Sequence, residues 1–168
     1  MAAAIEKAKV TRPSETAVIV ARDFRAPRDL VYKAYTTPAL VTRWLLGPPG
    51  WTMPVCEMDV RVGGAYRWRW RSEADGQEFG FHGIFREVVP GAKLVHTELY
   101  DPGDVGGSME DAGECLVTVE FTERAGITTM TTRMDFSSKE ACDAAVATGM
   151  TDGMEMSYAG LDDLLPTL

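Results

Sequence analysis

The segment RWLLGPPGWTMPVCEMDVRVGGAYRWRW, residues 43–70, contains all four tryptophans of the 168-residue chain. Its helical pattern ends at GPPG, because glycine and proline interrupt regular structure. From Trp51 onward apolar and polar residues alternate, which is typical of a strand with one buried face. Tyr66, Trp68 and Trp70 therefore share one face of their strand, and the intervening arginines share the other. The segment predicts a change from helices to a sheet with an aromatic inner face.

The same alternation predicts seven strands along the chain. Short turn sequences such as VGG, EADG, VPGA and RAG separate most of them, so consecutive strands are expected to be antiparallel. The expected strands are residues 16–24, 52–61, 65–72, 77–89, 93–100, 114–123 and 127–136.

Helical patterns follow the first strand and the last strand. Two short helices are expected between the first two strands, where Pro27 and Pro38 suit first turns. One long amphipathic helix is expected over residues 137–165, with Ser137 and Glu140 forming a capping box. Glycines at 149 and 153 each cost that helix about 1 kcal/mol relative to alanine. The glycines indicate either close packing against a neighbour or space deliberately left free of side chains.

These elements predict an α+β fold in which a seven-stranded antiparallel sheet curls around the long C-terminal helix, because each must bury its apolar face against the other. The two short helices close one end. Residues 1–15 are expected to be a mobile lead-in, and residues 16–168 to form one domain, which this length allows.

Charge argues against a nucleic-acid partner. The net charge is −8, and residues 101–168 carry 3 basic and 14 acidic side chains. Phosphate binding needs clustered positive charge. No apolar run reaches the roughly 18 residues of a membrane span, and the N-terminus lacks the apolar core of a secretory signal. Three widely spaced cysteines without a CxxC motif indicate reduced thiols and a cytoplasmic protein.

The aromatic strand face predicts an internal pocket. The strand carrying Trp68 and the helix carrying Trp44 meet near the open end of the predicted curl, and methionines supply adaptable walls. Large aromatic residues also serve as simple core, and that interpretation stays open beside the pocket. The predicted ligand-binding residues are Trp44, Trp51, Tyr66, Trp68, Trp70, Met130, Met150 and Met154.

Few residues suggest catalysis. His82 and His96 are expected on neighbouring strands, but no nucleophile triad, phosphate loop or metal-ligand spacing accompanies them, so neither a metal nor a cofactor is expected. An acid inside an apolar pocket has a raised pKa and can act as a general acid. Glu98 is the first catalytic candidate on this ground, and His96 is the second.

Two further predictions concern loops. Asp59 is expected either on a solvated face with Glu57 or in a salt link to Arg61 or Arg69 that holds the turn at residues 63–64. The glycine- and acid-rich link at residues 101–113 is long for a hairpin, and such links are often functional. We expect it to gate the pocket together with the second short helix, or else to be a solvated hairpin.

The chain resembles the family of activators of the 90-kDa heat-shock protein ATPase, within the START-like helix-grip superfamily. The resemblance extends over residues 16–165 and rests on FRAPRDLVYKAYTTPALVTRWLLGPPGWT, CEMDVRVGGAYRWRWR, FHGIFREVVPGAKLVHTEL and GMTDGMEMSYAGLDDLL. Asp59, Arg61, Gly63 and Gly64 match a D-x-R-x-G-G signature. Leu45 and Met154 stand where the family usually has tryptophan, which would change the shape of a pocket.

The resemblance implies a helix-grip fold and three functions. The first is non-catalytic binding of a small, largely apolar, aromatic or lipid-like molecule. The second is an enzyme of the polyketide cyclase/aromatase or hydrolase type. The third is a chaperone partner, which is the least expected because the chain lacks the extra domain with which the eukaryotic co-chaperone binds its chaperone. The family permits monomers and homodimers alike.

Overall fold

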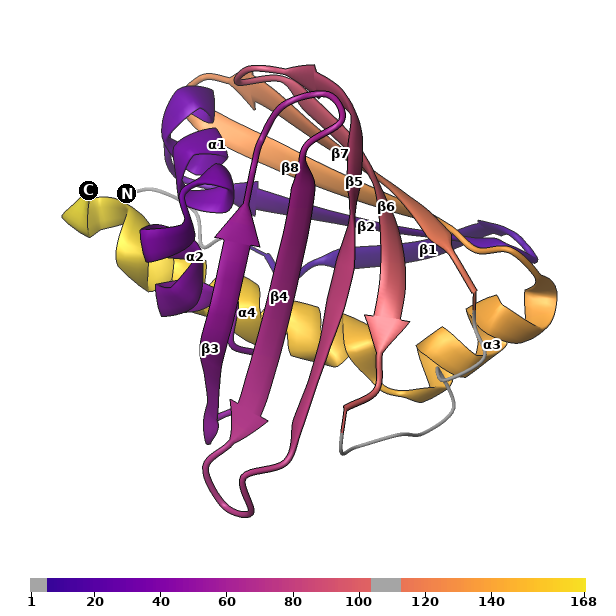
Figure 1. The fold of residues 1–168 in the computed structure, drawn as a ribbon. Coiled ribbons are helices and arrows are strands. Elements are labelled where there is room, and N and C mark those ends of the chain that lie inside the picture. Colours follow the sequence, from indigo (N-terminus) through magenta and orange to yellow (C-terminus); the bar gives the residue numbers. More distant parts are fainter. Residues whose placement is uncertain (1–5, 104–112) are drawn as a thin grey trace.

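The computed structural model describes residues 6–103 and 113–168, which form one antiparallel sheet of eight strands with the long helix α4 across its inner side (Figure 1). The order across the sheet is β1-β2-β8-β7-β6-β5-β4-β3. The strands are β1 Lys9–Ser14, β2 Ala17–Phe24, β3 Trp51–Met58, β4 Ala65–Ser72, β5 Glu78–Val89, β6 Lys93–Asp101, β7 Cys115–Arg124 and β8 Ile127–Asp135.

The predicted fold class is confirmed, but the predicted number of seven strands is wrong. The additional strand is β1, which lies inside the segment expected to be a lead-in and pairs with β2 through Val10 and Val20. All six of its residues are exposed. A strand that buries neither face has no apolar alternation, so its sequence carries no strand signal.

The two edges of the sheet share a feature. β1 contains Pro13, and its pairing with β2 shifts between Thr11 and Ser14. β3 contains Pro54, and its pairing with β4 shifts between Thr52 and Val55. Proline lacks a backbone N–H and is therefore confined to edge strands and bulges. Each edge strand is thus interrupted at the position where it carries its proline.

The helices differ from prediction at the C-terminus. The single helix expected over residues 137–165 is two helices, because Gly149 adopts a left-handed conformation with φ +78° that ends one and precedes the other. The N-cap is Ser138, not Ser137, and its hydroxyl accepts a hydrogen bond from the Ala141 N–H at 3.0 Å. The helical elements are α1 Arg28–Thr36, α2 Pro38–Trp44, α3 Lys139–Ala147, α4 Met150–Leu164 and the 3₁₀ helix η1 Leu165–Thr167.

Helix α4 is fixed to the sheet by a buried cation. The Arg22 side chain on β2 is 4% exposed and lies 2.7 Å from Asp162 and 3.2 Å from Glu155, both on α4. Between these two acidic residues on α4, Tyr158 packs edge-on to Phe24 and stacks on Trp44. α1 and α2 cover one end of the curled sheet (Figure 1). Among the described residues, no helix is long and apolar enough to cross a membrane.

Candidate functional site

The inner face of β4, β5 and β6 carries the aromatic side chains that the alternation predicts. Trp70 is paired with Phe79, Trp68 with Phe81, and Phe81 with Tyr100, and paired residues share a face. Neighbouring rings have centroids 5.3–6.3 Å apart. All of these rings except that of Trp68 are only half-buried. We call the half-buried set the aromatic cluster: Trp51, Trp70, Phe79, Phe81 and Tyr100.

Helix α4 is closely packed at Gly160 and leaves open space at Gly153. A Cβ at Gly160 would lie 3.4 Å from the Trp44 carbonyl oxygen. Gly153 is one and two turns before the buried Ser157 and Leu161, so it lies on the core-facing stripe of the helix. A Cβ at Gly153 would meet no atom of the described residues within 4 Å. Space is therefore left beside this position of α4.

The eight predicted ligand-binding residues fall into two groups. Four are buried, with exposed fractions of 1–6%: Trp44, Tyr66, Trp68 and Met130. Four are half-buried: Trp51, which packs edge-on to Phe79, and Trp70, Met150 and Met154, which pack against the core. Trp44 serves the core, since its Nε1 donates to the Ala34 carbonyl at 3.0 Å and ties α2 to α1. Ligand binding by these residues stays a prediction.

Sequence reasoning missed three members of the aromatic cluster. Phe79, Phe81 and Tyr100 were not among the predicted site residues, although they join Trp70 on one face. The signal was present in EFGFHG, where Phe79 and Phe81 alternate with glycines. Pairing that strand across the short EADG turn would have placed both rings beside the tryptophans.

The two catalytic candidates lie on the inner face of β6. His96 is 2% exposed, and burial lowers its pKa to about 4. Burial raises the pKa of the Glu98 carboxyl to about 7, and the neighbouring Tyr66 hydroxyl acts in the opposite direction. His82 is exposed on the outer face, so the two histidines do not converge. No group of metal-ligating side chains occurs within residues 6–103 and 113–168.

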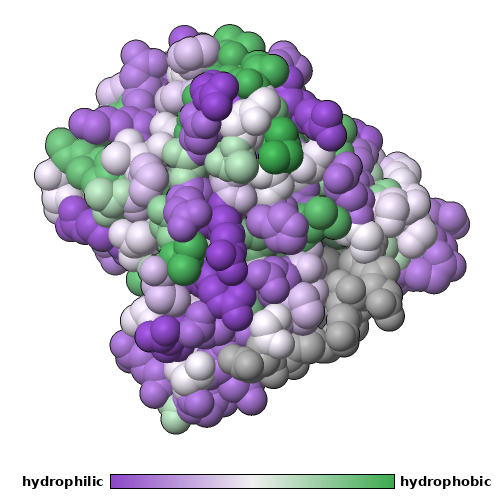
Figure 2. Space-filling model, in the orientation of Figure 1, coloured by the Kyte–Doolittle hydropathy of each residue, from purple (hydrophilic) through white to green (hydrophobic). Residues whose placement is uncertain are grey.

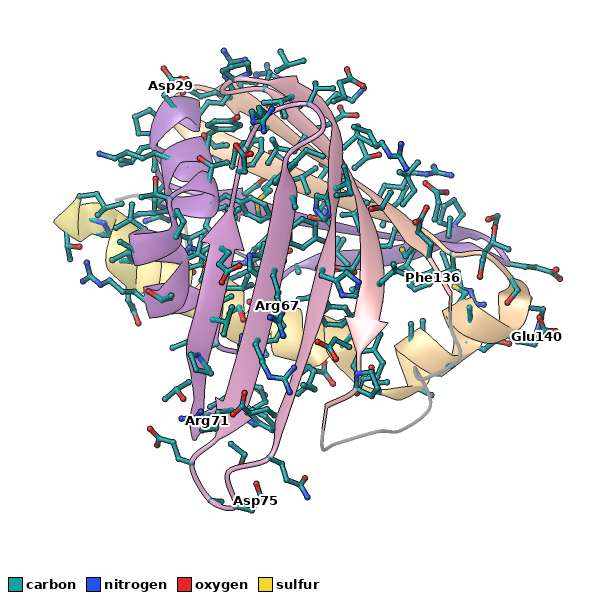
Figure 3. The ribbon with its side chains drawn as sticks, viewed as in Figure 1. Asp29, Arg67, Arg71, Asp75, Phe136 and Glu140 are labelled. Atoms are coloured by element: carbon teal, nitrogen blue, oxygen red, sulfur yellow. The ribbon has the colours of Figure 1, made fainter. Side chains whose placement is uncertain are left out.

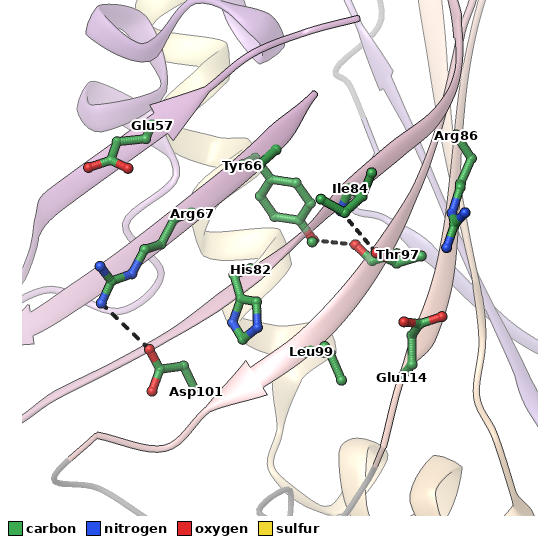
Figure 4. A pocket seen from close by; sticks show the side chains of 12 residues that line it. Glu57, Tyr66, Arg67, His82, Ile84, Arg86, Thr97, Leu99, Asp101 and Glu114 are labelled. Atoms are coloured by element: carbon green, nitrogen blue, oxygen red, sulfur yellow. Dashed lines mark hydrogen bonds and ion pairs between the residues drawn. The ribbon is translucent and has the colours of Figure 1, made fainter. Parts of the chain in front are cut away.

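The Thr97 peptide lies beside a short break in the β5–β6 ladder and contacts His96. Pairing runs from Gly80–Asp101 to His82–Leu99 and resumes in the same register at Phe85–His96, and the register shifts only beyond it, between Phe85 and Glu87. Within the break, the Ile84 N–H donates to the Thr97 hydroxyl at 2.9 Å, and the Tyr66 hydroxyl donates to the Thr97 carbonyl at 2.8 Å (Figure 4). The His96 Nδ1 lies 3.0 Å from the same carbonyl. The Thr97 peptide therefore holds both rings.

The outer face of the same strands is charged. Arg67 and Arg71 lie on the side of β4 turned away from α4 (Figure 3), and hydrophilic residues predominate over this surface (Figure 2). A shallow depression of about 570 Å³ here includes Arg67, His82 and Asp101 (Figure 4). The Arg67–Asp101 separation is 3.9 Å. The depression is open and lies on the outer face of the sheet, unlike the predicted internal pocket.

The loop predictions have separate outcomes. Asp59 is exposed and lies 2.8 Å from the Arg61 guanidinium, so the predicted salt link is present. A Cβ at Gly64 would lie 2.0 Å from the Asp59 carbonyl oxygen, which explains why that turn requires glycine. Glu57 is exposed opposite Arg67. The proposed gating link at residues 101–113 lies largely outside the described residues, which omit 104–112.

Comparison with known proteins identifies the family. The family model described as activator of Hsp90 ATPase homolog 1-like protein matches residues 25–166. The chain belongs to this family. Its membership is compatible with a ligand-binding or a chaperone-partner role. No curated protein matches the chain.

Solved structures agree with this assignment. A crystal structure of a Rhodobacter sphaeroides protein is 32% identical, covers 97% of this chain and 100% of its own, and has a TM-score of 0.87. A Chromobacterium violaceum protein is 26% identical over 90% of this chain and 98% of its own, with a TM-score of 0.72. A Mycobacterium smegmatis protein shares the fold at 20% identity, covering 96% and 97% of the two chains, with a TM-score of 0.81.

The raised pKa of Glu98 makes stability depend on pH. The folded-state pKa of about 7 exceeds the ordinary value of 4.5, so the carboxyl stabilises the fold below pH 4.5 and this contribution is lost as pH rises through 7. Relative to Glu98→Gln, the wild-type free energy of unfolding should fall by up to about 3 kcal/mol across this range. Urea unfolding of both proteins at pH 4.5, 6 and 8 measures the difference. A constant difference would contradict the burial of this carboxyl.

Proposed function

We propose that the protein binds a small, largely apolar molecule between the aromatic cluster and the first half of α4, without converting it chemically. The observation that carries the proposal is Gly153, a core-facing position of α4 where added side-chain volume would meet no described neighbour within 4 Å. Glycine costs about 1 kcal/mol at a helical position relative to alanine. Space for a bound molecule explains why this position carries a glycine that destabilises the helix.

The surroundings of this space support an apolar guest. Met150 and Met154 are half-buried on α4, and five half-buried aromatic side chains form the cluster on the sheet. Pockets for small molecules are lined mainly by apolar and aromatic side chains with a few polar groups. Contiguous apolar surface of this kind is otherwise unfavourable in contact with water. A flat aromatic or a lipid-like skeleton suits these walls.

Filling the space tests the proposal. Gly153→Leu should place a branched side chain where the guest lies, and we expect it to abolish binding of naphthalene while keeping or raising the melting temperature, since leucine favours helix. Binding is measured by isothermal titration calorimetry and by the ligand-induced rise in melting temperature, which follows the ratio of ligand concentration to Kd. Native mass spectrometry of the purified protein reports any guest already bound.

The matched control is Ala159→Leu. Ala159 is exposed on α4, so this substitution adds a similar side chain on the solvent face of the same helix. Wild type and Ala159→Leu should bind naphthalene alike. Equal binding by Gly153→Leu would show that the guest does not occupy this space. Absence of binding and of a co-purified mass in the wild type would count against a carrier function.

A second candidate is an enzyme of the cyclase/aromatase or hydrolase type. The observation that favours it is Glu98, whose pKa of about 7 lets the carboxyl hold or release a proton near neutral pH. The buried His96 lies two residues away on the same face of β6. If a substrate is found, Glu98→Gln should lower kcat without lowering the melting temperature, and unchanged turnover would remove Glu98 from the chemistry.

A further inference from the structure

Three buried side-chain polar atoms of the described residues have no hydrogen-bond partner in the structure. One is the Thr132 hydroxyl oxygen on β8, and the other two, the indole Nε1 of Trp68 on β4 and the imidazole Nε2 of His96 on β6, belong to neighbouring rings. The two residues are 6% and 2% exposed, and their ring centroids are 6.3 Å apart. Buried polar atoms in folded proteins almost always have a partner, so each exception requires an explanation.

The two atoms have opposite hydrogen-bonding character. An indole N–H can only donate. In His96 the Nδ1 lies 3.0 Å from the Thr97 carbonyl, and because a carbonyl oxygen only accepts, the Nδ1 carries the proton. The Nε2 is then a bare acceptor, and the pKa of about 4 keeps the ring neutral above that pH. Trp68 and His96 together therefore present one unused donor and one unused acceptor.

Two other tryptophans of the chain do have a partner for the indole N–H. Trp44 Nε1 donates to the Ala34 carbonyl at 3.0 Å, and Trp70 Nε1 donates to the Leu45 carbonyl at 2.7 Å. Trp68 also borders the aromatic cluster, with its ring centroid 6.2 Å from that of Trp70. The unused donor and acceptor thus lie next to the space assigned to the guest.

We propose that Trp68 and His96 bind a hydroxyl group carried by the apolar guest, its oxygen accepting from Trp68 Nε1 and its proton donated to His96 Nε2. A hydroxyl both accepts and donates at a single atom, which fits two side chains whose rings are this close. An ether or a carboxylate accepts at both partners and would leave the His96 nitrogen unmatched. This inference rests on the proposed function and narrows its ligand to an alcohol or phenol with an apolar, largely aromatic skeleton.

Three matched probes test the hydroxyl. Calorimetry compares 2-naphthol, naphthalene and 2-methoxynaphthalene, the last of which accepts a hydrogen bond but cannot donate one. Wild type should bind 2-naphthol at least about tenfold more tightly than naphthalene, because naphthalene leaves both buried atoms unpaired. The methoxy compound should lose most of this advantage. Equal affinity for all three probes would overturn the proposed hydroxyl site but would not contradict the proposed binding function.

Two variants and one control locate the effect. Trp68→Phe and His96→Leu should each reduce the 2-naphthol-to-naphthalene affinity ratio to within about threefold. His82→Leu is the matched control, because it makes the same replacement as His96→Leu on the exposed outer face of β5, and it should keep the wild-type ratio. An unchanged ratio in both variants overturns the assignment. If the variants do not fold, the comparison in wild type still decides, and binding of none of the probes overturns both proposals.

Discussion

Replacing Trp44 by alanine is expected to lower the free energy of unfolding by about 3–5 kcal/mol, the cost of removing a large aromatic side chain from a core. Trp44 is 2% exposed and lies between Tyr35 and Tyr158, with ring centroids 6.0 and 6.4 Å away. The substitution also removes the hydrogen bond to the Ala34 carbonyl. Both losses act where α2 joins α1 to α4, so the closed end of the fold should loosen.

Urea unfolding followed by circular dichroism measures this loss, and tryptophan fluorescence of the remaining indoles provides a second probe. Trp44→Phe is the control, because it keeps an aromatic ring and should cost less than half as much. Domains of this size are stable by about 5–15 kcal/mol, so the alanine variant should still fold. A loss below about 1 kcal/mol would contradict the central packing role of Trp44.

Gly83→Ala is expected to have a comparably large effect by a different mechanism. A Cβ at this position would lie 1.9 Å from the Thr97 carbonyl oxygen and 2.8 Å from the Tyr66 ring. Neither neighbour can retreat easily, because the Tyr66 hydroxyl is bonded to that carbonyl and Tyr66 is 2% exposed. One added methyl group must therefore separate β5 from β6, at a cost of about 3 kcal/mol or more.

Two controls separate this effect from general consequences of losing glycine or the hydroxyl. Gly153→Ala adds the same methyl group where space is open and should be neutral or stabilising by up to about 1 kcal/mol. Tyr66→Phe removes only the hydrogen bond and should cost about 1 kcal/mol. Melting temperature and hydrogen exchange of β5 and β6 are the measurements. A Gly83→Ala protein that melts like the wild type would show that the strands adjust without cost.

Much of the fold could be predicted because the inner strands bury one face. In AYRWRWR, the alternation alone predicts a strand with the tryptophans on one face and the arginines on the other. The edge strand KVTRPS has no buried face and gave no signal. The sequence indicates that Gly149 destabilises a helix. It does not show that this residue adopts a positive φ and separates two helices.

The candidate site was harder to predict than the fold. The sequence indicates Glu98 and His96 as candidates, and an acid inside an apolar pocket is expected to have a raised pKa. The exposure of each ring depends on what α4 covers, which no local pattern encodes. The contacts of Thr97 are likewise absent from the pattern, because they involve Tyr66 and Ile84 on other strands. The half-buried aromatic cluster and the unpaired atoms therefore required coordinates.

The prolines at the two margins of the sheet have a consequence for self-association. An open sheet ordinarily offers a row of amide groups onto which another molecule can add a strand, and repeated addition produces fibres. Pro13 and Pro54 each remove a donor from that row, and the irregular pairing beside each twists the margin. The margins of the sheet are therefore protected against strand addition although the sheet does not close into a barrel.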